Sequence, residues 1–226
     1  APVSTAHAMT PYFPANPDDE FDIARTRITN WVVNDFFYHA VRTGEILFPY
    51  RDAVEVPELK GSCDFWAINY YTRHFVTARN ASGTAPRYEC HRIRPIKNDF
   101  YLEEFYPQAL VDGLCRLKDL PVYITENGFC CDDDRLRILY VGRHLQALNE
   151  AIQRGCDIRG YLYWSLMDNF EWWSFVPRFG MVGVDFKTFE RTPKPSAYLY
   201  REIIERNGLD RELILKYLPE FRDWKI

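Results

Sequence analysis

The chain has 226 residues, enough for one sizeable domain or at most two small ones with a buried core. Hydrophobic residues make up 47% and charged residues 27%, a composition that argues against intrinsic disorder. Lys and Arg total 28 against 32 Asp and Glu, a formal charge of −4 with no long block of either sign, so we expect no nucleic-acid partner. No uninterrupted run of about 18 apolar residues occurs, so we expect no membrane partner either.

Aromatic residues are unusually frequent, at 16% of the chain. They serve cores first and flat-ligand or sugar surfaces second, because a ring offers a large apolar face beside a polar edge. Six cysteines, without C-x-x-C spacing, stand at positions 63, 90, 115, 130, 131 and 156. For a chain of this size we expect reduced thiols and a cytoplasmic location, against the alternative of a secreted disulfide framework.

The first predicted unit is a strand followed by a helix. An apolar stretch over residues 3–9 leads into a Pro-rich turn over 11–17, which no helix interior would tolerate. Asp18 and Asp19 can cap a helix, and Gly44 lies where that helix would stop. Its apolar positions, at spacings of three and four, are Phe21, Ala24, Ile28 and Trp31.

Two further strands are predicted from apolar runs. Residues 63–71 are almost continuously apolar and aromatic, as in a strand buried on both faces. Residues 73–97 are polar and irregular, and we expect a long excursion there. A helical pattern over 107–117 precedes a short buried strand over 120–125, which stops at Glu126. This second strand therefore has a carboxylate at its C-terminal end.

The remaining segments repeat the alternation. A helix follows the acidic residues 132–134 and ends at Gly155. Its apolar stripe comprises Leu136, Leu139, Leu145, Leu148 and Ile152. Residues 160–165 read as a strand, 168–172 as a loop and 195–207 as the last helix. Four strands alternating with helices indicate parallel β/α units, whose ligands bind at the C-terminal ends of the strands.

Three motifs carry a family resemblance. They are Ile124-Thr-Glu-Asn-Gly128, the segment Tyr163-Trp-Ser-Leu-Met-Asp-Asn-Phe-Glu-Trp172 and Asn69-Tyr-Tyr71. In this order and spacing they resemble glycoside hydrolase family 1, the β-glucosidase family. Residues 134–138, 178–180 and 184–186, with Tyr140 and His144, extend the match. The resemblance implies an α/β fold in which residues 1–226 form the C-terminal half, strands 5–8, of a TIM (β/α)8 barrel.

The resemblance also implies a catalytic set. Glu126 matches the nucleophile of the family, and a carboxylate at a strand end can attack an anomeric carbon if a neighbouring hydroxyl orients it. Tyr71 matches the tyrosine that makes this contact. Asn69 matches a residue that orients the opposite catalytic carboxylate or a sugar hydroxyl. Standing alone, a Glu before Asn-Gly would be a turn residue.

Three residues match the sugar site. Trp164 and Trp172 resemble the pair of which one forms an apolar platform under the pyranose and the other donates an indole N–H. Glu171 matches the carboxylate that accepts hydrogen bonds from hydroxyls remote from the scissile bond. By composition alone such an aromatic cluster would be core packing. No metal or nucleotide cofactor is expected, because the chain has neither metal-ligand spacing of histidines nor a phosphate-binding glycine loop.

The sequence lacks one part of this machinery. A retaining glycosidase needs two carboxylates about 5 Å apart, and the Asn-Glu-Pro motif that supplies the acid in the family is absent. The resemblance therefore implies a β-glycoside substrate and, as partner, an N-terminal barrel half on a separate or cleaved polypeptide, or on one outside residues 1–226. The alternative is a non-catalytic carbohydrate-binding or scaffold half-barrel. Between Trp172 and Arg178 the loop is one residue shorter than usual and contains Pro177, which leaves substrate preference open.

Overall fold

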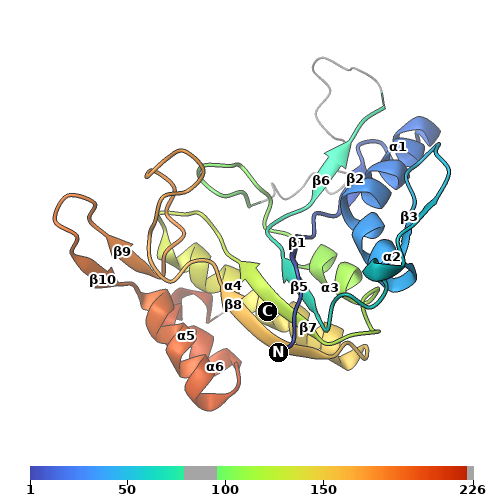
Figure 1. The fold of residues 1–226 in the computed structure, drawn as a ribbon. Helices are drawn as coiled ribbons and strands as arrows, with labels where there is room; N and C mark the ends of the chain where they lie inside the picture. The colour runs from blue at the N-terminus through green and yellow to red at the C-terminus, as the bar shows by residue number, and fades with distance from the viewer. Residues whose placement is uncertain (79–95, 223–226) are drawn as a thin grey trace.

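The computed structural model describes residues 1–78 and 96–222 (Figure 1). Within these ranges the central sheet has four strands in the order β1-β5-β7-β8, and every pairing in it is parallel. The strands lie in their order along the chain, and each crossover between them contains at least one helix. The predicted parallel β/α units are therefore confirmed, as one side of an α/β barrel.

The described elements have the following bounds. The helices are α1 (Glu20–Asn30), α2 (Phe36–Thr43), α3 (Gln108–Leu114), α4 (Asp134–Gln153), α5 (Pro195–Arg206) and α6 (Arg211–Tyr217). The strands are β1 (Ala6–Ala8), β2 (Tyr12–Pro14), β3 (Glu45–Ile46), β4 (Val54–Glu55), β5 (Trp66–Asn69), β6 (His74–Val76), β7 (Val122–Asn127), β8 (Ile158–Tyr163), β9 (Val182–Val184) and β10 (Arg191–Pro193). A π-helical turn spans Trp31–Asp35, and 3-10 turns span Pro57–Leu59 and Pro219–Phe221.

The main core lies between the sheet and the helices of its crossovers. Ile68 of β5 and Ile124 of β7 are completely buried there, together with Leu110 and Leu114 of α3. Leu148 of α4 joins the same cluster. Burial of the strands by helices explains why their sequences are nearly continuous apolar runs rather than alternating ones. A second cluster joins α4 to α5 and α6.

Helix α1 forms as predicted, but its predicted apolar stripe is wrong. Phe21 is 59% exposed, whereas Asp22 and Thr26 are buried. The Asp22 carboxylate accepts hydrogen bonds from the backbone N–H groups of Asn16 and Ala78, at 3.0 and 2.6 Å. A polar side chain is buried at this position because it satisfies backbone donors from the loop just before α1 and from the segment that follows β6.

Helix ends follow the sequence closely. Asp19 caps α1 and Asp133 caps α4, each accepting backbone N–H bonds through its carboxylate. Gly44 and Gly155 follow α2 and α4 with φ of +83° and +90°, a conformation that glycine adopts without steric cost. The predicted stops are confirmed, although a π-helical turn divides the first predicted helix into α1 and α2.

Three features were not predicted. The Pro-rich turn contains β2, which pairs in parallel with β6 inside the segment expected to be irregular. Helix α6 follows α5 and packs against it and α4. On α4, Ile152 is 45% exposed while Arg137 and His144 are completely buried, so the predicted stripe is only partly right. Arg137 is buried because its guanidinium donates to the carbonyls of Cys131 and Arg178.

The cysteines and the helix lengths bear on two earlier expectations. Five cysteines are free thiols, and Cys90 lies outside the described residues. Among the described helices, none combines the length and apolar character that a membrane crossing requires.

Candidate active site

Glu126 is the last residue but one of β7, whereas the predicted strand over 120–125 stopped before it. β7 runs to Asn127, and Glu126 pairs in register with Asn69, the last residue of β5. Because parallel strands end at the same edge of a sheet, the two side chains meet where ligands of such folds bind. The pairing of β7 with β5 and β8 therefore holds the backbone of Glu126 in place.

Tyr71 holds the Glu126 carboxylate. The Tyr71 hydroxyl donates a 2.6 Å hydrogen bond to Oε2 of Glu126, and both residues are half-buried. Burial raises the pKa of Tyr71 well above its ordinary value, and the hydrogen bond to the carboxylate raises it further. The phenol therefore keeps its proton, donates it in a hydrogen bond to Oε2 of Glu126 and fixes that oxygen in place.

Asn69 contacts the neighbour of Glu126 rather than Glu126 itself. The Thr125 hydroxyl donates a 2.6 Å hydrogen bond to Oδ1 of Asn69. This bond fixes the amide plane of Asn69 and directs its Nδ2 donor group away from Thr125. The structure brings Asn69 to the same strand ends as Glu126 and Tyr71.

A buried network behind these residues had not been predicted. Asn127 is completely buried, and its Nδ2 donates to the Tyr70 carbonyl at 2.7 Å and to the Tyr140 hydroxyl at 2.8 Å. The Tyr140 hydroxyl donates in turn to the carbonyl of Tyr71, while Tyr161 donates to Oδ1 of Asn127. Asn127 and Tyr140 thus connect the backbones on either side of the Tyr71–Glu126 pair, which rigidifies it.

The glycine after Asn127 has a steric reason. A Cβ built on Gly128 would lie 1.7 Å from the carbonyl oxygen of Trp164, so any other residue there would displace one of the two backbones. This close approach brings the end of β8 against the end of β7. It therefore places Trp164 beside the strand that carries Glu126.

Trp164 and Glu171 form the second part of the site. The indole Nε1–H of Trp164 donates to Oε1 of Glu171 at 2.9 Å, and Glu171 is 5% exposed. Burial raises the pKa of Glu171, the hydrogen bond from Trp164 lowers it, and the nearby negative charge of Glu126 raises it again. Asn127 and Tyr163, the residues next to Glu126 and Trp164 in the chain, are partners in the β7–β8 pairing, so the Trp164–Glu171 pair follows the strand that neighbours Glu126.

Trp172 and its neighbour Trp173 occupy the tip of a tight turn. They are 76% and 89% exposed and both have positive φ, 35° and 75°. Glu171 and Ser174 close the turn through two backbone hydrogen bonds of 2.8 and 3.0 Å. Glu171 is thus buried at the base of the turn while two indoles project from it. Nothing in the sequence predicted that Trp173 is exposed.

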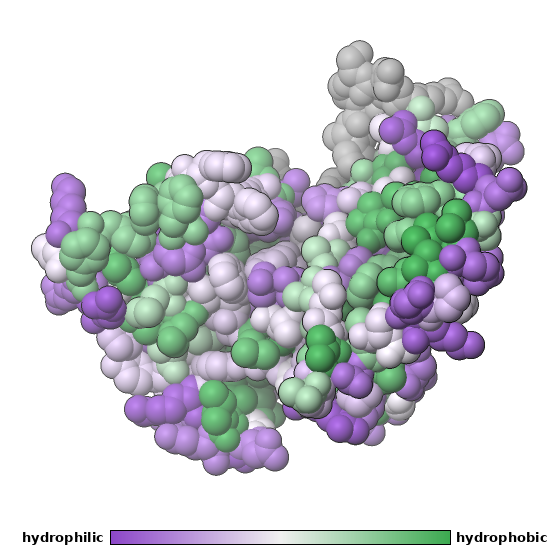
Figure 2. Space-filling view, viewed as in Figure 1, coloured by the Kyte–Doolittle hydropathy of each residue, from purple (hydrophilic) through white to green (hydrophobic). Residues whose placement is uncertain are grey.

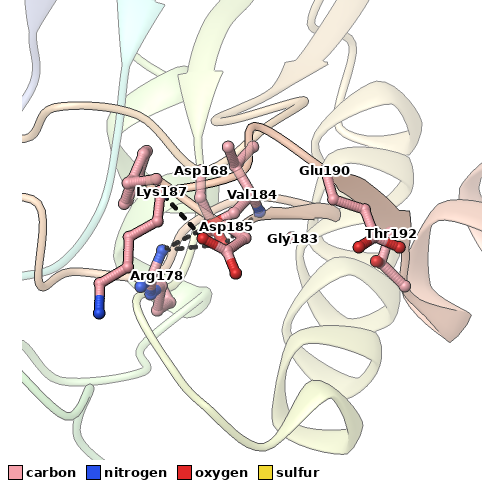
Figure 3. Close-up of a pocket in the computed structure, with 9 residues that line it drawn as sticks. Asp168, Arg178, Gly183, Val184, Asp185, Lys187, Glu190 and Thr192 are labelled. Atoms are coloured by element: carbon pink, nitrogen blue, oxygen red, sulfur yellow. Dashed lines mark hydrogen bonds and ion pairs between the residues drawn. The ribbon is translucent and has the colours of Figure 1, made fainter.

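Asp168 fixes the loop that carries these residues. Its carboxylate accepts from the backbone N–H of Gly180 at 2.8 Å and lies 3.5 Å from Arg178 and 3.6 Å from Lys194. A cavity of about 640 Å³ adjoins Asp168 and Arg178 (Figure 3). Neither Glu126 nor Glu171 lines that cavity, so it is separate from the candidate site.

The segment before α3 adds two residues that sequence reasoning missed. The Tyr101 hydroxyl is buried without a hydrogen-bond partner among the described residues. Burial raises the pKa of Tyr101, and the negative charge of Glu171 raises it further. Burial also raises the pKa of Glu103, which accepts a 2.8 Å bond from Asn98. No periodicity in this segment pointed to either side chain.

The wider surroundings of the site are open. Figure 2 shows a hollow on the visible face between the lobe that carries β9–β10 and the lobe that carries α1. Over residues 1–78 and 96–222, no group of three or more His, Cys, Asp or Glu side chains is placed to hold a metal ion.

Solved structures similar to this one are glycosidases. A β-glycosidase from Pyrococcus horikoshii superposes with a TM-score of 0.77 at 32% identity, covering 94% of this chain and 50% of that chain. A β-glucosidase from Thermotoga maritima, solved in complex with glucoimidazole, superposes with a TM-score of 0.77 at 29% identity, covering 91% and 51%. These likenesses confirm the predicted partial TIM barrel.

Curated relatives that match this chain include galactosidases. A β-galactosidase from Sulfolobus acidocaldarius is 36% identical over 224 residues, which cover 93% of this chain and 44% of the relative. A 6-phospho-β-galactosidase from Streptococcus mutans is 31% identical, covering 92% and 55%. The chain spans about half the length of the curated relatives it matches. Residues 1–209 match the sequence profile of glycosyl hydrolase family 1, and the chain belongs to that family.

Proposed function

We propose that this chain carries the nucleophile and part of the sugar site of a retaining β-glycosidase. The observation that carries the proposal is the Tyr71 hydroxyl fixed 2.6 Å from the Glu126 carboxylate, in the same site as the Trp164–Glu171 pair. A carboxylate held by one hydroxyl and a second, deeply buried carboxylate beside an aromatic ring is a constellation suited to sugars. The relatives, a β-galactosidase and a β-glycosidase among them, support β-glycosides as the substrate class.

In the proposed reaction Glu126 attacks the anomeric carbon. The carboxylate forms an ester with that carbon as the bond to the leaving oxygen breaks, and an acid elsewhere protonates the leaving oxygen. Water then attacks the anomeric carbon, the bond from that carbon to the Glu126 oxygen breaks, one proton of the water passes to the base, and Glu126 returns as the free carboxylate. Tyr71 holds the carboxylate oxygen that does not attack, so the other oxygen is presented in a fixed orientation.

Sugar recognition follows from the second pair. The N–H of Trp164 is occupied by Glu171, which leaves the indole face to act as the platform under the pyranose. Trp172 then takes the other role, donating its indole N–H to a hydroxyl. Glu171 accepts hydrogen bonds from hydroxyls remote from the scissile bond, and Asn69 orients a hydroxyl or the second catalytic carboxylate through its amide.

The proposal also needs a second catalytic carboxylate about 5 Å from the first. We assign residues 1–226 to the C-terminal half of the barrel, and the acid to an N-terminal half on a separate polypeptide or on another part of a longer chain. Within the described residues β1 and β8 are the sheet edges. Leu162 on β8 is 53% exposed and offers apolar surface on which a further element of the barrel can pack. The free thiols support a cytoplasmic location.

A mechanism-based label tests the proposal. With the complete barrel assembled, a 2-deoxy-2-fluoro β-glycoside should accumulate as an ester, because the fluorine slows breakdown of the glycosyl-enzyme. Peptide mapping is expected to find the added mass on the peptide containing Glu126. Binding of the sugar without any covalent label would instead support a carbohydrate-binding half-barrel, and a label on another carboxylate would disprove the assignment.

Glu171 tests the sugar-binding part of the proposal. Glu171→Gln should raise KM by about 10- to 100-fold, the value of one or two hydrogen bonds to a charged acceptor, and should change selectivity among epimers. The effect on kcat should be smaller. Because burial and Glu126 raise the pKa of Glu171, wild-type binding should weaken on acidification at a higher pH than for an ordinary Glu.

The pH profile supplies the control for this variant. Gln does not titrate, so the acidic rise of KM should disappear in Glu171→Gln while the rest of the profile is kept. Complete inactivity of a correctly folded variant would contradict a role in recognition.

A further inference from the structure

A pair of cysteines lies outside the candidate site. Sγ of Cys156 donates a hydrogen bond to Sγ of Cys115 across 3.9 Å, although the two residues are 41 positions apart. Both are free thiols. A disulfide has its sulfurs about 2.05 Å apart, so the pair needs an approach of about 1.8 Å, through side-chain rotation and small shifts of the turn after α3 and the loop before β8. We propose that Cys115 and Cys156 are a redox-active dithiol that a peroxide converts to a disulfide.

The surroundings favour reaction at this pair. Cys115 ends α3 and is half-buried, so a small oxidant reaches it from solvent. Two cations, Lys118 and Arg154, act electrostatically on Cys156 and lower its pKa against the effect of burial. Positive charge beside a thiol stabilises its thiolate, which is the nucleophile in thiol oxidation. The other described cysteines, Cys63, Cys130 and Cys131, are all buried.

The two thiols have different roles. Burial raises the pKa of Cys156 to about 11, and its hydrogen bond to Cys115 contributes further. Cys156 is buried and donates its S–H to Cys115, so the half-buried partner, Cys115, is the thiol that meets the oxidant. The Cys115 thiolate attacks one oxygen of hydrogen peroxide, the O–O bond breaks, and sulfenic acid and hydroxide form.

The second step closes the bridge. Sulfur of Cys156 attacks the sulfenic sulfur of Cys115, the S–O bond breaks, and hydroxide leaves as the thiol proton is lost. In total two thiols lose two electrons and two protons, and the peroxide is reduced to two molecules of water. The balance needs no other reagent.

The position of the bridge determines its effect. Cys156 lies before β8 and Cys115 lies before β7, so both are at the N-terminal ends of the strands, opposite Glu126. The bridge would enclose β7 and α4, the two elements that carry Glu126 and Tyr140. Cross-linking a loop of about 40 residues constrains the unfolded chain without moving the site. We expect a raised Tm, reversed by reductant, at unchanged geometry of Glu126.

Peptide mapping of the full chain tests the proposal. The native, fully reduced chain is treated with an equivalent of hydrogen peroxide, remaining thiols are alkylated, and the digest is analysed by mass spectrometry. The expected product joins the peptides of Cys115 and Cys156 and is lighter by two hydrogen atoms than their sum. The Tm of the oxidised chain should rise by at least about 5 °C and return on reduction.

Variants and an unfolded sample complete the test. Cys115→Ser should abolish the cross-linked peptide, whereas the matched variant Cys63→Ser should leave its yield unchanged. Oxidation of the urea-unfolded chain should give mixed pairings, because only the fold brings these two sulfurs together. The proposal is overturned if both thiols remain alkylatable after native oxidation, or if Cys115 pairs with any cysteine other than Cys156, including Cys90.

Discussion

Glu126→Ala should lower kcat of the assembled barrel by at least about 10⁴-fold, because no other group replaces a lost covalent nucleophile. Tyr71, whose hydroxyl now donates to Oε2 of Glu126, would lose its acceptor without loss of the fold, since Glu126 is half-buried at a strand end. The expected loss is measured as kcat on an activated aryl β-glycoside. Circular dichroism and thermal unfolding would confirm the integrity of the variant.

Chemical rescue makes this result specific to a nucleophile. Azide added to Glu126→Ala fits the space left by the carboxylate and attacks the anomeric carbon from the same face. The expected product is an α-glycosyl azide, of configuration opposite to the β-substrate, because only one displacement has occurred. Glu205→Ala, an exposed glutamate on α5, serves as matched control and should keep wild-type activity. Rescue that yields a β-glycosyl product would contradict the assignment.

Much of the fold was predictable because local rules and global packing agree. The apolar runs over 63–71 and 120–125 become β5 and β7, and Gly44 and Gly155 end helices through positive φ. Helix α1 departs from its predicted face because Asp22 is buried where it accepts backbone hydrogen bonds from Asn16 and from the distant Ala78. A periodicity argument assigns such a residue to solvent, since it does not include long-range backbone donors.

The site was predictable where motifs supplied it and not elsewhere. The proximity of Tyr71 and Glu126 depends on the register of β5 against β7. The order of the parallel units in the sequence makes these two strands neighbours, and their pairing then brings the two residues together. Tyr101 and Glu103 come from a segment without periodicity, so the sequence did not predict that the Tyr101 hydroxyl is buried or that burial raises the pKa of Glu103. The catalytic roles of these residues stay predictions until the label and the variants have been tested.

The other large effect concerns a polypeptide of residues 1–226 alone. In the described residues β1 and β8 each pair on one side only, and an unpaired strand edge is a template for association. Val3 and Leu162, 60% and 53% exposed, add apolar surface near these edges. On a sizing column such a polypeptide should therefore run larger than its mass of 26.8 kDa.

The same polypeptide should hydrolyse alkyl β-glycosides negligibly. General acid catalysis contributes about 100- to 10,000-fold, and a leaving alkoxide needs that proton far more than an activated phenolate does. Adding a polypeptide that carries the Asn-Glu-Pro half should restore activity together with a discrete complex, and replacing its Glu by Gln should remove the gain on alkyl substrates. Glu103→Gln is the internal control, because it tests whether this chain contains an acid of its own. Among the described residues, Glu103 is a carboxylate besides Glu171 whose pKa is raised by burial. If residues 1–226 form a monodisperse monomer that cleaves alkyl glycosides unaided, and Glu103→Gln abolishes that cleavage, the acid lies within this chain and the two-part barrel is wrong.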